Sequence, residues 1–361
     1  MRPLLPTLSE SVKYLRGIEE RRWYTNFGPL VTALETRLAE HFALPPGNAA
    51  LVANGTTGLS AALLAAGAQP GKKCLLPSWT FVASAGAIWA ANLIPHFVDV
   101  SAETWAVDPD FVRRRSDLSD IGAVMPISPF GSPVDTQAWD TFSNETGIPV
   151  VIDAAAAFDT VSSITQSRPA RTPTVISLHA TKALGMGEGG LVLSTSGDFI
   201  RRLRQVCNFG LWGPPDDQIL GYNGKVSEYH AAIGLAALDA WPDRRIALQS
   251  ITDRYAAALR TLPRVDLTPQ YGQGWVSAYC TVLVPGEAGT VADRMTAEGI
   301  ETRRWWHKGV AAQQAYRDFP SDPLPVTGEI AARALSLPFF HDMGDAAIDA
   351  VAGALKRALP Q

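Results

Sequence analysis

Short apolar segments alternate with helical patterns between residues 49 and 152 of the chain. The segments expected to be strands are 49–53, 73–76, 94–98, 123–127 and 149–152, and those expected to be helices are 57–66, 81–92 and 135–145. This alternation predicts a mostly parallel sheet with helices on both faces, which is an α/β architecture. Two further apolar segments, 175–178 and 190–194, are separated by a short stretch without a clear helix, so we expect them to pair antiparallel.

The C-terminal part of the chain shows a different pattern. A helix expected over 226–240 ends near Pro242, which is a natural boundary. It is followed by an expected helix over 245–262, a strand over 278–284, and helices over 291–298 and 345–359. Because 361 residues exceed one small core, we expect a large domain over 1–243 and a smaller α+β domain over 244–361. The segment up to about residue 28 is free to pack elsewhere.

Composition and charge narrow the classes of protein that this chain can be. Hydrophobic residues make up 47% of the chain and charged residues 18%, which allows a substantial core. The formal net charge of -4 gives no electrostatic reason to expect binding to nucleic acid or to an anionic membrane. The apolar stretch 81–94 is too short and too interrupted to span a bilayer, and the N-terminus lacks the apolar region of a signal peptide. Three widely separated cysteines show neither metal-binding spacing nor a disulfide framework, so we expect a soluble cytoplasmic protein without a metal site.

Candidate chemistry is expected where the strands end, since ligands of such sheets bind at the carboxyl ends of the strands. Lys182 closes the segment 177–182, which follows an expected strand and precedes the glycine-dense loop 185–190. A lysine amine can form an imine with an aldehyde once its neighbours lower its pKa. The alternative is a surface lysine beside a tight turn between two strands.

An acidic residue, Asp153, ends the apolar strand 150–152. A carboxylate at this place can hold a protonated pyridine nitrogen and so strengthen the ring as an electron sink. The alternative is that Asp153 caps the helix or turn that follows.

Two earlier strand ends add a phosphate site and an aromatic group. Gly55 and Thr56 open a helix whose backbone N–H groups can bind phosphate, with the hydroxyl of Ser177 in support; ordinary capping is the alternative. Trp79 or Phe81 can stack on a planar cofactor ring, although most aromatic residues pack in the core. The four features follow four strands in order, and this joint pattern indicates a site for pyridoxal 5'-phosphate (PLP).

Together these motifs resemble the DegT/DnrJ/StrS-type sugar aminotransferases, a fold type I PLP family that acts mainly on nucleotide-linked keto sugars. The resemblance runs from about residue 24 to residue 338 and includes 25–29 with Glu35, 54–56, 77–81, 153–155, 177–182, 187–190 and 221–228. It implies a homodimer in which Asn223 reaches the cofactor phosphate of a neighbouring subunit. It also implies that Asn26 and Lys225 lie near the substrate, and that Phe81 rather than Trp79 stacks on the ring.

The chain departs from the family pattern at two places. Ala156 occupies a position where the family usually has Gln or His beside the phenolic oxygen of the cofactor. The late segment 303–309 replaces a Tyr-x-Pro-Leu-His-type sequence, and four of its residues are candidates for binding a sugar diphosphate: Arg303, Arg304, Trp306 and His307. The alternative is a solvated basic turn whose tryptophans pack inward. Lys182 argues against a related branch of dehydratases, which has His in its place.

The resemblance implies an aminotransferase that moves an amino group, with glutamate as the expected donor, to a nucleotide-linked keto-6-deoxy sugar. Amination of a 4-keto sugar is favoured over a 3-keto sugar. In this mechanism Lys182 moves the proton and Asp153 stabilises the carbanion through the ring nitrogen. The alternatives are an aminotransferase acting on a non-nucleotide ketone such as an inosose, and a PLP-binding regulatory protein without turnover.

Overall fold

The computed structural model of the chain describes residues 2–360. The α-helices in this range are α1 (Leu8–Arg21), α2 (Pro29–His41), α3 (Gly55–Ala65), α4 (Val82–Ala90), α5 (Pro109–Arg113), α6 (Thr136–Thr146), α7 (Phe158–Ser163), α8 (Gly197–Cys207), α9 (Glu228–Asp239), α10 (Trp241–Leu259), α11 (Ala288–Ala297), α12 (Pro325–Arg333) and α13 (Asp345–Ala358). The strands are β1 (Ala49–Val52), β2 (Lys73–Pro77), β3 (Ile94–Val98), β4 (Ile121–Val124), β5 (Ile152–Asp153), β6 (Thr174–Ser177), β7 (Gly190–Leu193), β8 (Asp266–Leu267), β9 (Cys280–Leu283) and β10 (Ala334–Leu337).

The large sheet has the strand order β3-β2-β4-β5-β6-β7-β1. Hydrogen bonding links β3-β2-β4 on one side and β5-β6-β7-β1 on the other, and two parallel bridges, Val124 to Val150 and Ile127 to Asp153, join the two halves. The pairs β2–β3, β2–β4 and β5–β6 are parallel, whereas β7 is antiparallel to both β6 and β1. The expected parallel sheet and the expected antiparallel pair are both confirmed, because the link from β6 to β7 contains no crossover helix.

The strand expected over 149–152 is shorter than predicted. Regular pairing covers only Ile152 and Asp153, although Val151 donates its N–H to the carbonyl of Val124 at 3.0 Å. Pro149 lacks an N–H group and cannot contribute a donor to the sheet. The backbone nevertheless stays extended up to Asp153, so this residue lies at the carboxyl end of a central strand.

Two helices of the large sheet begin directly after their strands. The side chain of Asn54 accepts a hydrogen bond from the N–H of Thr57 at 2.8 Å and caps α3 behind β1. Phe81 is the N-terminal capping residue of α4 behind β2. The N-termini of both helices therefore face the edge of the sheet where β5 and β6 also end.

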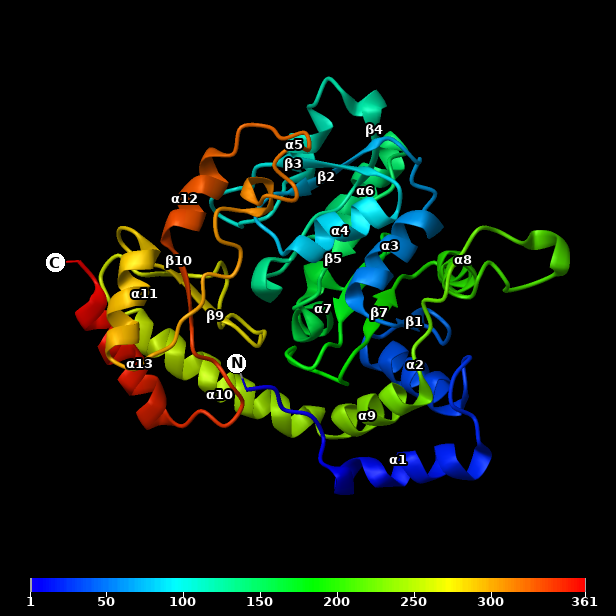
Figure 1. Cartoon of the computed structure of the whole chain (residues 1–361), viewed down its shortest axis with the longest axis horizontal. Helices are drawn as coiled ribbons and strands as arrows, with labels where there is room; N and C mark the ends of the chain where they lie inside the picture. The colour runs from blue at the N-terminus through cyan, green and yellow to red at the C-terminus, as the bar shows by residue number, and fades with distance from the viewer. Residues whose placement is uncertain (1, 361) are drawn as a thin grey trace.

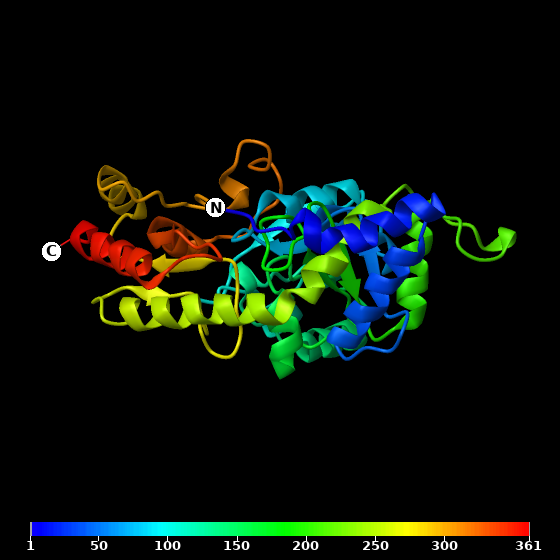
Figure 2. The same ribbon diagram turned by 90° about the horizontal axis from the view of Figure 1, so that it is seen from below.

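The C-terminal part of the chain contains a second, smaller sheet with the strand order β10-β9-β8. Figure 1 shows this sheet beside α10, α11 and α13, and Figure 2 shows α10 running from the region of the large sheet toward it. Pro242 lies in the first turn of α10, where its missing N–H costs no helical hydrogen bond. The residue marks the start of a new helix, and the division at 243/244 stays a prediction.

The N-terminal helix α1 packs along α9 of the same chain (Figure 1). Lys13 and Tyr14 of α1 donate hydrogen bonds to the carboxylate of Asp239 at 2.7 and 2.8 Å. The N-terminal segment thus packs on a helix that follows the large sheet in sequence.

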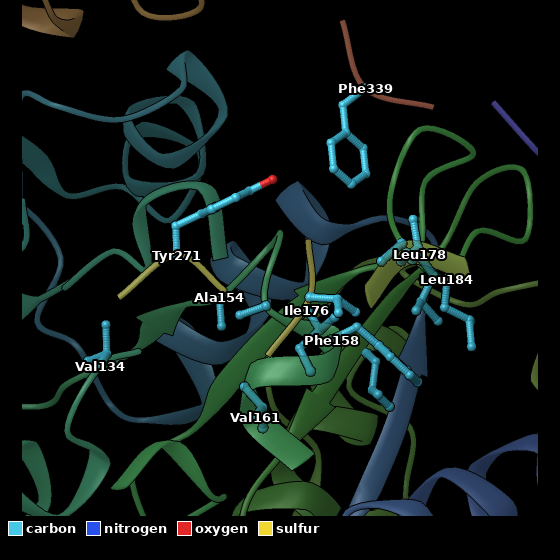
Figure 3. Packing of buried hydrophobic residues seen from close by; sticks show 14 of the residues in the cluster. Val134, Ala154, Phe158, Val161, Ile176, Leu178, Leu184, Tyr271 and Phe339 are labelled. Atoms are coloured by element: carbon cyan, nitrogen blue, oxygen red, sulfur yellow. The ribbon is translucent and has the colours of Figure 1, made fainter. Parts of the chain in front are cut away.

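The core behind β5 and β6 is apolar and continuous with the C-terminal part of the chain. Figure 3 shows Ala154, Ile176 and Phe158 packed in this cluster, which also includes Tyr271 and Phe339 from distant segments. Strands buried in this way hold the residues at their carboxyl ends in fixed positions.

Across residues 2–360, no helix combines the length and apolar character needed to cross a bilayer. The same range contains no cluster of three His, Cys, Asp or Glu side chains arranged to bind a metal ion.

Candidate active site

A cavity of about 500 Å³ lies at the carboxyl ends of the strands of the large sheet. Six of the residues expected to bind PLP line it: Gly55, Thr56, Phe81, Asp153, Ser177 and Lys182. The candidate substrate-binding residue Trp306 lines it as well. The C-terminal part of the chain closes the opposite wall with Tyr279, Trp305 and Trp306. The cavity is therefore assembled from segments that are far apart in the sequence.

Asp153 is buried and points its carboxylate into this cavity. Ser84 donates its hydroxyl to one carboxylate oxygen at 2.7 Å, and the N–H of Ala155 donates to the other at 3.0 Å. Burial raises the pKa of the Asp153 carboxyl, while these two hydrogen bonds and the charge of Lys182 act in the opposite direction. The carboxylate does not cap the next helix, since α7 begins only after Ala157. A buried carboxylate that is held by two hydrogen bonds and lines the cavity fits a protonated ring nitrogen.

Lys182 projects into the cavity from the loop between β6 and β7. Its amine donates a hydrogen bond to the hydroxyl of Tyr279 at 3.1 Å. The loop is held by backbone hydrogen bonds from Leu178 to Gly189 and from Ala180 to Gly187. Gly187 has a φ of +94°, which side chains rarely allow. The glycines therefore permit the tight turn that presents Lys182.

The N-terminus of α3 forms the phosphate end of the cavity. Gly55 and Thr56 lie in the first turn, whose N–H groups have no acceptor within the helix. A methyl group at residue 55 would lie 3.3 Å from the Cβ atom of Ser177, so glycine keeps this corner open. The donor set consists of helix N–H groups and the hydroxyl of Ser177, which fits a phosphate group.

The structure separates the two aromatic candidates. Phe81 lines the cavity with 53% of its side chain exposed. Trp79 is only 2% exposed, lies outside the cavity lining and packs edge-on against Trp306, with ring centroids 4.9 Å apart, so the structure does not bring it to the expected position of the cofactor. The chain turns after β2, where the N–H of Thr80 bonds to the carbonyl of Ser78. This turn places the two aromatic side chains on different sides.

The segment 303–309 does not bring its cations into the cavity. Arg303 pairs with Glu301 at 3.0 Å, and Arg304 donates to the carbonyl of Ala331 at 3.2 Å. His307 is exposed and lies outside the cavity lining, while Trp306 stacks on Phe130 with ring centroids 4.1 Å apart. The expectation that Arg303, Arg304 and His307 contact the substrate is not supported within one chain. Within one chain Arg303 and His307 are exposed, Arg304 is half-buried, and Trp306 is buried and lines the cavity.

Three further candidates lie outside the cavity of their own chain. Asn223 is exposed on the loop between α8 and α9, and its side chain accepts the N–H of Lys225 at 3.3 Å. The ammonium group of Lys225 lies 4.4 Å from the ring centroid of Phe209. Asn26 is exposed with a φ of 61°. The role expected for these residues in a neighbouring subunit stays a prediction.

Sequence reasoning missed two residues that shape the site, Ser84 and Tyr279. Ser84 lies on α4 and faces Asp153, and a helical count from Phe81 could have placed it on the inner face. Tyr279 comes from the C-terminal part and lines the cavity beside Lys182, as does Trp305 of the segment 303–309. No local pattern marks Tyr279, because only the tertiary fold brings it to the large sheet.

Comparisons with known proteins agree with this geometry. A model of the DegT/DnrJ/EryC1/StrS aminotransferase family matches residues 7–356. A dTDP-4-amino-4,6-dideoxy-D-glucose transaminase of Shigella dysenteriae is 27% identical over 360 residues, which cover 98% of this chain and 97% of that protein. The structure of DesI in the presence of its TDP-sugar product is 31% identical, with a TM-score of 0.88 over 99% of this chain and 91% of that one. A Bacillus cereus protein, solved as a candidate PLP-dependent aminotransferase, is 28% identical, with a TM-score of 0.89 over 98% of both chains.

These matches confirm the fold type I architecture and PLP as the cofactor. The family model spans nearly the whole chain, and the cavity contains an acid, a lysine and a helix N-terminus that fit the cofactor. The chain belongs to the DegT/DnrJ/EryC1/StrS aminotransferase family and is a PLP-dependent aminotransferase.

Proposed function

We propose that this enzyme transfers an amino group from glutamate to a nucleotide-linked keto-6-deoxy sugar, with the keto group at carbon 4. The observation that carries the proposal is the convergence of Lys182, Asp153 and the N-terminus of α3 on one cavity. The Shigella relative is named for a product with its amino group at carbon 4 of a 4,6-dideoxy sugar, and DesI was solved with a TDP-sugar product. Both likenesses support a nucleotide sugar as the acceptor.

The residues of the cavity have separable roles in this reaction. Bound PLP supplies an aldehyde that links to amines and a ring that accepts electrons from the adjacent carbon. Asp153 holds the proton on the ring nitrogen and keeps the ring electron-poor. The amine of Lys182, when free of the cofactor, would take the proton from the α-carbon of the amino donor and pass it to the carbon of PLP that carries the aldehyde. The N–H groups of Gly55 and Thr56 bind the phosphate, and Phe81 packs on the ring.

The sugar diphosphate needs cations that the cavity of one chain does not supply. Within residues 2–360, the lining of the cavity includes no arginine. The loop between α8 and α9 extends away from the body of the molecule (Figures 1 and 2). It exposes Phe209, Leu211 and Leu220, the last with 96% of its side chain exposed. We infer that this loop packs on a second copy of the chain, where Asn223 and Lys225 complete the partner's site.

Two half-reactions test the proposal. Glutamate should convert the PLP form of the enzyme to the pyridoxamine form, seen as loss of the visible absorbance band. The pyridoxamine form should then aminate 4-keto-6-deoxy nucleotide sugars faster than 3-keto isomers or an inosose. Amination of the inosose alone would contradict the substrate class, and no spectral change with glutamate or other amino donors would indicate a cofactor-binding protein without turnover.

Substitution of Lys182 tests the role proposed for this residue. Lys182→Ala removes the amine that moves the proton, so turnover should be abolished. The far-UV circular dichroism should stay as in the parent, since the side chain is not part of the core. Turnover at the parent rate would show that another residue carries this role.

A further inference from the structure

The wall of the cavity formed by Ala156, Phe130 and Trp306 offers little polar chemistry of its own. Ala156 lines this wall and contributes only a methyl group. Phe130 and Trp306 lie stacked on each other in the same wall, with an angle of 11° between their rings. Ser128, which also lines the cavity, donates its hydroxyl to the carbonyl of Ser132 at 2.5 Å. A polar atom of the cofactor that faces this wall therefore needs a partner from elsewhere.

Tyr279 supplies a hydroxyl at this place. Its oxygen lies 3.1 Å from the amine of Lys182, and the lysine amine lies 5.3 Å from the ring centroid. A phenol has one donor and two acceptor positions. The hydroxyl can therefore accept a hydrogen bond from Lys182 and donate its own proton to a second atom at the same time.

The segment that carries Tyr279 is fixed at both ends. Val276 donates its N–H to the buried carboxylate of Asp159 at 2.9 Å, and Ser277 donates its hydroxyl to the carbonyl of Phe130 at 2.7 Å. Directly after Tyr279 the chain enters β9, which pairs with β10. The ring also packs edge-on against Trp305, with centroids 5.7 Å apart. The hydroxyl is thus held in place before any ligand binds, which reduces the entropy lost on binding.

The chemistry of PLP identifies the second atom. In this cofactor the aldehyde carbon and the phenolic oxygen are attached to neighbouring ring carbons. The nitrogen that links Lys182 to the aldehyde and the phenolic oxygen are therefore close neighbours. A hydroxyl within hydrogen-bond distance of the lysine nitrogen is also within reach of that oxygen.

We propose that Tyr279 positions Lys182 and donates a hydrogen bond to the phenolic oxygen of PLP, on the side of the cavity where Ala156 provides no donor. The inference rests on Lys182 as the lysine that binds the cofactor. After the amino donor has displaced Lys182, the same hydroxyl holds the free amine against the wall. Tyr279 thereby connects the C-terminal part of the chain to the lysine that moves the proton.

The proposal predicts the direction of a spectroscopic shift. A donated hydrogen bond stabilises the negative charge on the phenolic oxygen, so this oxygen holds the neighbouring proton of the linking nitrogen less tightly. In Tyr279→Phe that donor is lost, and the pH midpoint of the visible absorbance change should rise by roughly one pH unit. Asp153, His179 and Glu188 also line the cavity, and they are unchanged in every variant compared.

The experiment is a pH titration of the visible absorbance of the PLP-bound enzyme without substrate. Tyr279→Phe should show the raised midpoint and bind PLP several-fold more weakly. Tyr255→Phe is the matched control, since it removes a buried hydroxyl that bonds to the carbonyl of Pro338 outside the cavity. Its midpoint should equal that of the parent.

A second variant tests whether the lost donor is the cause. Ala156→Gln in the Tyr279→Phe background returns an amide donor to the same wall, so the midpoint should move back toward the parent value. An unchanged midpoint in Tyr279→Phe, or a shift that the glutamine does not reverse, would overturn the proposal. If Lys182→Ala kept the parental band, the cofactor lysine itself would be misassigned, which is a distinct outcome.

Discussion

Asp153 is a carboxylate whose surroundings disfavour its charge unless a cation lies in the cavity. Replacement by Asn keeps a similar shape and can still bond to Ser84 and Ala155, but it cannot hold a pyridinium proton. We expect Asp153→Asn to retain PLP and to lose about 10²-fold or more in kcat, an effect of the size seen for groups that control proton transfer. Single-turnover rates with glutamate measure this loss. Near-parental rates would mean that Asp153 only orders the turn after β5.

The raised pKa of Asp153 also predicts how the stability of the cofactor-free protein depends on pH. The folded protein holds this proton more tightly than the unfolded chain, whose carboxyl pKa is about 3.9. The unfolded state therefore binds fewer protons between about pH 4 and the raised pKa, and stability falls as the pH rises through this window. Cofactor-free Asp153→Asn should have a higher Tm than the parent at neutral pH, and the difference should vanish near pH 4. A constant difference in Tm across this range would contradict the assignment.

Phe81 and Trp79 lie two residues apart and should respond differently to truncation. Phe81→Leu removes a ring exposed to the cavity, so PLP affinity should weaken by about 0.5–1.5 kcal/mol beyond simple burial, with little change in Tm. Trp79→Ala removes a buried ring and should lower the free energy of unfolding by about 3–5 kcal/mol. Cofactor titration and chemical denaturation of both variants separate the two effects. Equal losses of cofactor affinity at similar stability would show that both rings contact the cofactor.

At the scale of elements, Glu228 connects two helices that lie far apart in sequence. Its buried carboxylate accepts the N–H groups of Leu30 and Val31 at 2.9 Å each, at the start of α2. A methyl group at Gly28 would collide with this carboxylate, which explains the glycine before Pro29. Part of the motif that resembles the family therefore serves to hold α2 on α9.

Glu228→Ala leaves these N–H groups without a partner, so the free energy of unfolding should fall by about 1–3 kcal/mol. Glu40→Ala, on the exposed face of α2, is the matched control and should change it by less than about 0.5 kcal/mol. Chemical denaturation followed by tryptophan fluorescence measures both. A loss of activity with an unchanged free energy of unfolding would contradict this structural role for Glu228.

The elements of the large sheet were predictable because their periodicity and their boundary residues agree. The strand over 94–98 was placed at its observed bounds, and Asp135 caps the helix that was expected over 135–145. The strand β8 was missed because two residues carry too little pattern, and β10 was missed because it begins directly after α12 with no turn between them. Lys182, Asp153 and Phe81 could be placed because each follows a strand. Tyr279 could not, because its position depends on how the C-terminal part packs against the sheet.

At the scale of the whole molecule, the cavity of a single chain is incomplete for a nucleotide sugar. The part of its lining that the structure describes (residues 2–360) contains no arginine, and Asn223 and Lys225, at the base of the loop between α8 and α9, lie outside that lining. If two chains exchange these loops around a twofold axis, each site contains Lys182 from one chain and Asn223 from the other. In such a dimer, a substitution of Lys182 and a substitution of Asn223 affect the same site only when the two substitutions lie on different chains.

A mixed dimer tests this arrangement directly. Lys182→Ala chains and Asn223→Ala chains, each with its own affinity tag, are expressed together, and species with both tags are isolated. One site of such a dimer contains both substitutions and the other contains neither, so about half of the parent activity per dimer should return. Each variant alone should be inactive or strongly impaired, because every one of its sites carries a substitution. If Asn223 acts within its own chain, each site of the mixed dimer carries one substitution, and no activity should return beyond the average of the two variants.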